Sequence, residues 1–168
     1  MRGFLAIAAC AALLAGGSLF ANDDGTEAYG ADAYVSCAAC HLADGSGIPG
    51  MFPPINNRVA AIAKLDGGRE FLMAVVSFGL MGTIEAGGVQ FADIMPGNKG
   101  LMSAADIAAA INYVIFELVD DQDKLADVKP LTADEVVALE SSVTAGGPAM
   151  AAELRKRLVE RNGEQWPR

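Results

Sequence analysis

The clearest hydrophobic pattern of the chain runs from residue 103 to residue 118. Ser103 is a good helix N-cap, and Asp106 three residues later supplies the carboxylate of a capping box. Beyond them, apolar residues recur at three- and four-residue spacing, as on one face of an amphipathic helix. The segment therefore predicts a helix, whose apolar stripe comprises Ile107, Ala110, Ile111, Val114, Ile115 and Leu118.

Earlier segments predict shorter helices separated by loops. A helix is expected over residues 31–41, and apolar positions in residues 69–79 predict another that ends at a glycine. The intervening residues 42–66 contain several glycines and prolines and are predicted to be rich in loops. Residues 83–94 surround a Gly-Gly pair and are consistent with either a small hairpin or an irregular loop.

The C-terminal segment predicts two more helices. Thr132 and Glu135 have the spacing of a capping box, so a helix is expected over residues 133–143. A highly charged helix is expected over residues 151–161, where an Asn-Gly pair then stops it. No metal-binding or nucleophile motif occurs in this segment.

The first residues have the pattern of an export signal. Arg2 supplies a positive start, an apolar stretch follows up to Leu19, and polar residues begin at Asn22. This pattern predicts a signal peptide of residues 1–21 that is cleaved on export to the periplasm. The alternative is a leader that is not cleaved and anchors the protein in the membrane, since the stretch is about as long as the shortest membrane spans.

Length and composition predict one domain with an extension. The chain has 168 residues, of which 52% are hydrophobic. Acidic residues at 120–123 mark the end of the compact part, so we expect a domain of residues 22–118 and a helical extension of residues 119–168. The helices of the extension are expected either to contact a partner protein or, alternatively, to pack on their own domain or stay mobile.

The charge of the chain limits the choice of partners. The formal net charge is −9, which argues against binding to the phosphates of nucleic acid. It is compatible with a redox partner that has a basic docking face, and equally with a protein that is simply soluble.

Cys37, Cys40 and His41 form the strongest chemical motif. Two thiols separated by two residues, followed directly by an imidazole, are typical of the covalent attachment of c-type haem. The spacing lets each sulfur form a thioether with one haem vinyl group, while the histidine turns toward the iron. Cys10 lies in the predicted leader, so cleavage leaves only these two thiols in the mature protein.

The sequence also limits the choice of a second iron ligand. His41 is the only histidine, so one subunit cannot supply two histidine ligands. Met95 is the favoured sixth ligand because it lies beside Pro96 in a loop just before the best-capped helix, and a thioether suits a haem of raised potential. Met81 is its rival, and an open sixth position is the remaining alternative.

Pro53 is expected to orient the histidine. A ligating imidazole usually donates its other N–H to a carbonyl oxygen, which fixes the ring. The loop after the haem motif contains Pro53 and Pro54, and the carbonyl of Pro53 is the predicted acceptor for His41.

Together these residues resemble the class I (mitochondrial-type) c-type cytochromes. The resemblance covers residues 27–118 and rests on the Cys-X-X-Cys-His motif, the Phe-Pro-Pro-Ile loop, the Met-Pro pair and the last helix. It implies an all-α fold around one covalent haem, with the first and last helices crossing near Tyr34 and Tyr113. It also implies that His41 and Met95 are the axial ligands. Bacterial members with this loop are often cytochrome subunits or electron acceptors of periplasmic dehydrogenases.

The expected function is therefore electron transfer without catalysis, either as a free carrier or as a dehydrogenase subunit. Expected partners are redox proteins: a dehydrogenase as donor, and a terminal oxidase or another cytochrome as acceptor. One alternative is a haem enzyme or gas sensor whose sixth iron position is open or easily vacated. Another is a thiol–disulfide oxidoreductase that uses Cys37 and Cys40, although the chain lacks the β-rich pattern of those proteins.

Overall fold

The computed structural model describes residues 30–143 and 146–167. The predicted signal peptide of residues 1–21, with its cleavage site, lies outside the described residues.

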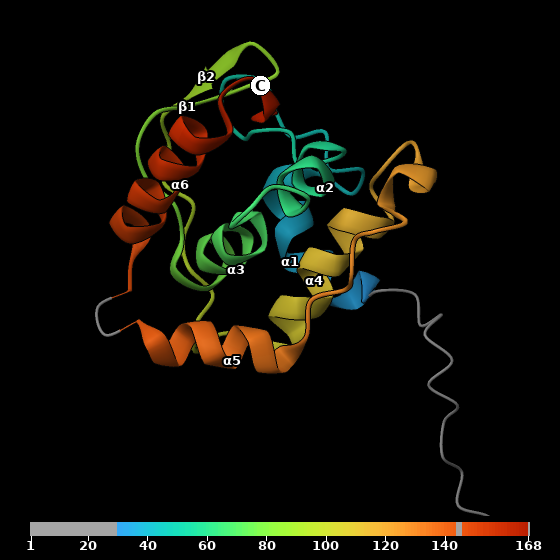
Figure 1. Ribbon diagram of the computed structural model, residues 1–168, viewed down its shortest axis with the longest axis vertical. Helices are drawn as coiled ribbons and strands as arrows, with labels where there is room; N and C mark the ends of the chain where they lie inside the picture. The colour runs from blue at the N-terminus through green and yellow to red at the C-terminus, as the bar shows by residue number, and fades with distance from the viewer. Residues whose placement is uncertain (1–29, 144–145, 168) are drawn as a thin grey trace, which may run out of the picture.

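The described residues form a helical fold with one small hairpin (Figure 1). This confirms the expected all-α fold. Figure 1 shows α1, α3 and α4 near the centre, α5 along one end, and α6 along the side near the hairpin. In chain order the elements are α1 (Ala31–His41), α2 (Arg58–Ala63), α3 (Gly68–Phe78), β1 (Ile84–Ala86), β2 (Val89–Phe91), α4 (Ala104–Phe116), the 3₁₀ turn η1 (Gln122–Leu125), α5 (Ala133–Ser142), α6 (Pro148–Asn162) and the 3₁₀ turn η2 (Gly163–Gln165).

Both predicted capping boxes are present. The Ser103 hydroxyl accepts from the backbone N–H of Asp106, whose carboxylate accepts from Ser103 in return, at the start of α4. Thr132 and Glu135 make the same reciprocal bonds at the start of α5. The predicted apolar stripe of α4 faces inward, because most of its members are buried: Ile107, Ala110, Ile111, Val114 and Ile115.

Two helices differ from the prediction. Residues 42–66 are not loop throughout, because α2 forms there and buries Ala60, Ile62 and Ala63. Helix α6 begins at Pro148 and not at residue 151. Proline suits the first turn of a helix, because the backbone N–H that it lacks would have no partner within the helix there. Of the two alternatives for residues 83–94, the structure has the hairpin, with β1 and β2 antiparallel.

Helices α1 and α4 cross closely, as the resemblance implied. The Tyr34 and Tyr113 rings are stacked with their centroids 5.0 Å apart. Tyr34 is buried, and its hydroxyl donates to the carbonyl of Leu42 at 2.8 Å, just beyond the end of α1. A methyl group on Gly30 would lie 3.4 Å from the Cβ of Ala109, so the helices approach to van der Waals contact at this glycine. The crossing fixes α1, which carries the haem motif.

The helices after residue 118 pack on the rest of the chain. Helix α5 contacts α3 and α4, and α6 contacts α3. Leu131, Val136 and Leu158 belong to the same hydrophobic core as α3 and α4. The second of the two alternatives for these helices, packing on their own domain, is thus what the structure shows. The domain boundary at residue 118 stays a prediction.

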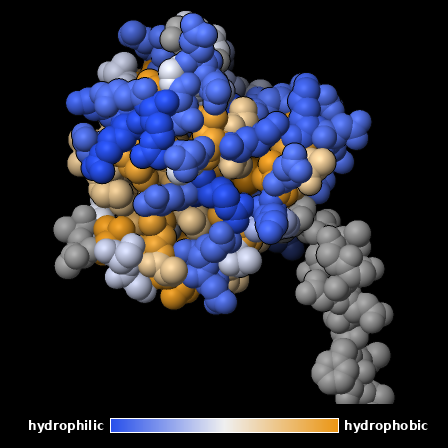
Figure 2. Space-filling view, in the orientation of Figure 1, coloured by the Kyte–Doolittle hydropathy of each residue, from blue (hydrophilic) through white to orange (hydrophobic). Residues whose placement is uncertain are grey.

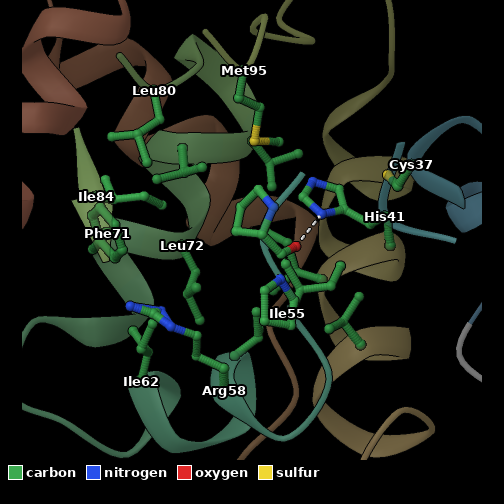
Figure 3. Close-up of a pocket in the computed structure, with 18 of the residues that line it drawn as sticks. Cys37, His41, Ile55, Arg58, Ile62, Phe71, Leu72, Leu80, Ile84 and Met95 are labelled. Atoms are coloured by element: carbon green, nitrogen blue, oxygen red, sulfur yellow. Dashed lines mark hydrogen bonds between the residues drawn. The ribbon is translucent and has the colours of Figure 1, made fainter. Parts of the chain in front are cut away.

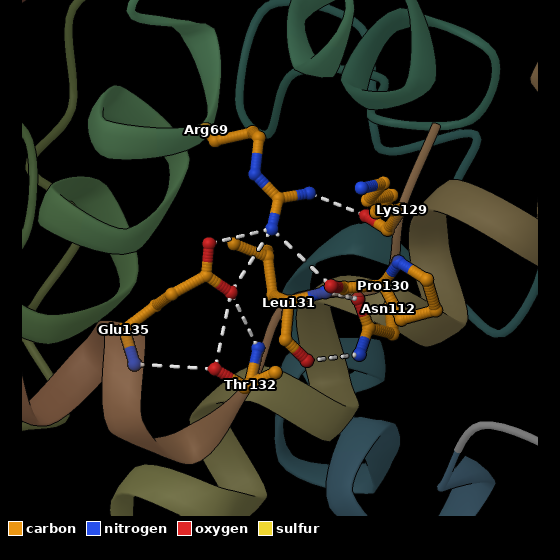
Figure 4. A network of polar contacts seen from close by, with 7 residues as sticks. All are labelled: Arg69, Asn112, Lys129, Pro130, Leu131, Thr132 and Glu135. Atoms are coloured by element: carbon orange, nitrogen blue, oxygen red, sulfur yellow. Dashed lines mark hydrogen bonds and ion pairs between the residues drawn. The ribbon is translucent and has the colours of Figure 1, made fainter. Parts of the chain in front are cut away.

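Polar contacts hold the segment before α5 against α3 and α4 (Figure 4). Asn112 of α4 donates to the carbonyl of Leu131 at 2.9 Å and accepts from its N–H at 2.8 Å. Arg69 of α3 pairs with Glu135 at 2.7 Å and donates to the carbonyls of Lys129 and Pro130. The chain is therefore held to two central helices just before α5 begins.

The surface is mixed in character. Figure 2 shows hydrophilic residues over much of one face, with hydrophobic residues visible between them. Across residues 30–143 and 146–167, no helix combines the length and the apolar character needed to cross a membrane.

Candidate functional site

An apolar cavity lies at the centre of the fold (Figure 3). It holds about 860 Å³ of empty space, part of it open to solvent. Helices α1, α2, α3, α4 and α6 all contribute to its wall, together with the loops that carry Pro53 and Met95. Most lining side chains are aliphatic or aromatic, among them Ile55, Ile62, Leu72, Val75, Ile111 and Val114.

His41 is the last residue of α1, and it lines the cavity. It is 8% exposed, and its Nδ1–H donates to the carbonyl of Pro53 at 2.9 Å. Burial lowers the pKa of His41, and the bond to Pro53 opposes that shift. A neutral ring with its Nδ1 proton committed to Pro53 leaves the lone pair of Nε2 free, which is the form that binds a metal.

The loop that presents Pro53 requires a glycine at residue 47. Gly47 has φ +67°, and its N–H donates to the carbonyl of His41 at 3.0 Å. A methyl group on Gly47 would lie 2.4 Å from the carbonyl oxygen of Phe52. The close approach lets the Pro53 carbonyl reach the histidine ring.

The two cysteines occupy successive turns of α1. Cys37 lines the cavity, whereas Cys40 is half-buried and is not part of the cavity wall. Both thiols are free, and burial raises the pKa of Cys37. A thiol of raised pKa in the wall of an apolar cavity, as at Cys37, fits thioether attachment better than exchange chemistry, which relies on a thiol of lowered pKa.

Met95 enters the cavity from a loop. Its backbone N–H and carbonyl pair with those of Leu80 at 2.9 and 3.0 Å, which fixes the loop against the residues after α3. Figure 3 shows the Met95 sulfur turned toward the interior of the cavity. Met81, the rival, is 40% exposed and does not line the cavity.

Gly79 is expected to control the position of Met95. It has φ +83°, and a methyl group there would lie 2.4 Å from the Met95 carbonyl oxygen. The substitution Gly79→Ala should therefore displace Met95 and weaken any optical signal of a methionine–iron bond. Gly82→Ala is the matched control, because Gly82 has φ +93° but nothing within 4 Å of the added methyl. Both variants place an alanine at a positive φ, at a backbone cost of about 1–3 kcal/mol, so equal optical spectra would contradict this expectation.

Three residues in the wall were not expected from sequence patterns. Arg58 of α2, Arg155 of α6 and Trp166 after η2 line the cavity. No motif marks the two arginines. The only signal was Trp166 itself, a single tryptophan in an otherwise charged terminal segment.

The residues present fit a haem. The cavity is apolar and large, one wall carries a thiol and a histidine with a free nitrogen, and another carries a methionine thioether. A helical fold that encloses such a cavity beside a Cys-X-X-Cys-His segment is the architecture of a c-type cytochrome.

Comparison with known proteins agrees. No protein-family model matches the chain. The chain is 38% identical over 146 residues to a cytochrome c-552 of Thermus thermophilus, and the match covers 87% of this chain and 93% of the relative. It is 38% identical over 132 residues to another Thermus thermophilus cytochrome c-552, with 79% and 98% covered. The chain belongs to this family of c-type cytochromes. Its members are electron-transfer proteins and not enzymes, and they bind their haem covalently.

The likeness to these relatives reaches into the C-terminal helices. An alignment over 146 residues is longer than the segment that ends at residue 118, so it includes part of residues 119–168. The extension is therefore at least partly a feature that this chain shares with its relatives.

Proposed function

We propose that this chain is an exported carrier of single electrons with one haem, bound through Cys37 and Cys40 and ligated at its iron by His41 and Met95. The observation that carries the proposal is that His41 and Met95 line one apolar cavity while Cys37 lies in the same wall. The bound haem supplies the redox chemistry, because its iron alternates between Fe(III) and Fe(II) while no bond to a substrate is made.

The protein residues set the conditions for this transfer. Pro53 holds the His41 ring in one orientation, so little movement accompanies a change of oxidation state. The Met95 thioether is a soft, neutral ligand that favours the reduced iron. The apolar wall excludes water and disfavours the extra positive charge of the oxidised centre. All three effects support a closed site with a raised potential.

The leader and the partners complete the proposal. Residues 1–21 act as a signal peptide and direct the protein to the periplasm, where residues 22–118 provide the cytochrome domain. Its partners are redox proteins, which would exchange electrons with the bound haem. A role as a dehydrogenase subunit rests on the resemblance of the loop at residues 47–54. Co-purification of the untagged protein tests it, and elution alone at low salt would favour the free carrier.

The variant Met95→Ala tests the iron ligands. The oxidised protein is expected to show the weak absorption band at the red end of the spectrum that marks a methionine–iron bond, and Met95→Ala should abolish it. Met81→Ala is the control, because Met81 is exposed and outside the cavity wall. The methionine favours the reduced iron, so the potential of Met95→Ala should also fall. Loss of the band in Met81→Ala with retention in Met95→Ala would contradict the assignment.

A further inference from the structure

One end of the cavity carries cationic and polar groups in an otherwise apolar wall. Arg58, Arg155 and Trp166 meet there, although they come from α2, from α6 and from the residues after η2. The two guanidinium carbons lie 5.7 and 5.5 Å from the centre of the same indole ring. Phe71 packs edge-on against that ring at 5.9 Å, so the indole is fixed from a third side.

Two hydrogen-bond donors at this end have no acceptor among residues 30–143 and 146–167. Trp166 is 5% exposed, and its Nε1–H is buried without an acceptor in the part of the chain that the structure describes. The same holds for Nε–H of Arg58, although a terminal nitrogen of the same guanidinium donates to the carbonyl of Glu85 at 3.2 Å. A buried donor without an acceptor costs about 1–3 kcal/mol, more for a charged group. Such a pair of donors therefore calls for a bound acceptor.

The two positive charges at this end of the cavity favour a bound anion. Arg58 and Arg155 approach one tryptophan, yet no carboxylate of residues 30–143 and 146–167 forms an ion pair with either. Burial, followed by repulsion from Arg155, lowers the pKa of Arg58 to about 10, so the group stays charged at neutral pH. Burial also lowers the pKa of Arg155. An anion between the two groups would relieve both effects.

We propose that Trp166, Arg58 and Arg155 bind the propionate carboxylates of the haem, so that the C-terminal residues close the cavity over the acidic edge of the cofactor. This inference rests on the proposed haem site, and it adds a task for the segment after residue 118. A carboxylate is the matching ligand because it accepts N–H bonds from guanidinium and indole groups, and it neutralises the two arginines. The apolar remainder of the wall suits the rest of the ring.

The closure would couple the chain end to the redox centre. Two cations close to the haem disfavour the more positive, oxidised iron, so they raise the potential. Trp166 would position the carboxylate through one hydrogen bond, and it would also hold α6 against α2 and α3. Neither role requires a contact between these residues and the iron.

The first test removes one hydrogen bond from the loaded, full-length protein. Trp166→Phe keeps an aromatic ring against Phe71 but lacks the N–H group. The resonance Raman bending mode of the haem propionates should move to lower frequency in this variant. An unmoved mode would overturn the role of Trp166, because a purely structural role would leave the propionate vibration unchanged.

The second test removes one charge. Arg155→Gln should shift the redox equilibrium toward the oxidised form by roughly tenfold at an effective dielectric constant near 20, which is ~59 mV for a one-electron couple. Arg157→Gln is the matched control on the same helix, since Arg157 is 64% exposed and pairs with Glu153. Arg155→Lys keeps the charge and should retain the potential, which guards against a failure of Arg155→Gln to fold. Equal potentials in Arg155→Gln and Arg157→Gln would overturn the proposal, as would a potential of Arg155→Lys as low as that of Arg155→Gln.

The two proposals fail in different ways. Absence of the methionine–iron band in the unaltered protein would remove the Met95 assignment but would not affect the propionate mode. Presence of that band together with an unmoved mode in Trp166→Phe would remove only the anion site.

Discussion

Without its haem, the polypeptide is expected to lose its cooperatively folded state. The cavity lies between α1, α2, α3, α4 and α6, so its wall is also the inner surface of the core. Each large aliphatic side chain that is left facing water costs ~1.5–3 kcal/mol. Four or five such side chains already amount to about 10 kcal/mol, which is the whole stability of a typical domain. The lining contains more than that number, among them Ile55, Val59, Ile62, Leu72, Val75, Val76, Ile111 and Val114.

Circular dichroism checks this expectation. The double variant Cys37→Ala and Cys40→Ala, purified free of haem, should show low helicity and no sharp thermal transition. The haem-loaded protein is the reference and should melt cooperatively. A haem-free chain with native helicity and a cooperative transition would contradict the expectation, because the core would then form around an empty cavity.

The substitution Asn112→Ala is expected to have the largest effect of any single polar change on stability. Asn112 is 4% exposed and Leu131, whose N–H and carbonyl it bonds, is 3% exposed. Its removal leaves two buried backbone groups without partners, at ~1–3 kcal/mol each. The expected loss is about 3 kcal/mol, which lowers the melting temperature by about 10 °C in a chain of this size.

Arg69→Ala is the instructive comparison. Arg69 makes more contacts than Asn112, but its side chain is 28% exposed and that of its partner Glu135 is 40% exposed. Water screens such a pair, so the expected loss is only ~1 kcal/mol. Thermal denaturation of both variants decides the order, and a larger loss in Arg69→Ala would show that the charge network, and not the buried amide, fastens the chain before α5.

The elements predicted best are those whose signals are local. Helices α4 and α5 begin with side chains that bond their own first turn, and both capping boxes were readable from Ser103 and Thr132. Helix α2 was missed because it has six residues, no side-chain cap, and a position among glycines and prolines. Packing of Ile62 and its neighbours in the core stabilises it, and no local pattern reports such packing.

The site shows the same difference between residues with a local sequence signal and residues brought together only by tertiary packing. His41, Pro53 and Met95 were selected from a short motif, a loop and a count of possible ligands, and the structure brings them to one cavity. Arg58 and Arg155 could not be selected, because they approach the same indole ring only when α6 packs against α3. Their common site depends on tertiary arrangement, which spacing along the chain does not encode.

Carbon monoxide binding to the reduced, full-length protein tests whether the iron centre is closed. If His41 and Met95 both ligate the iron, no sixth position is free, and the absorption spectrum should stay unchanged when the gas is added at neutral pH. Met95→Ala, with that position vacated, should bind the gas readily and supplies the positive control. Immediate binding by the unaltered protein would contradict ligation by Met95 and favour the haem enzyme or gas sensor.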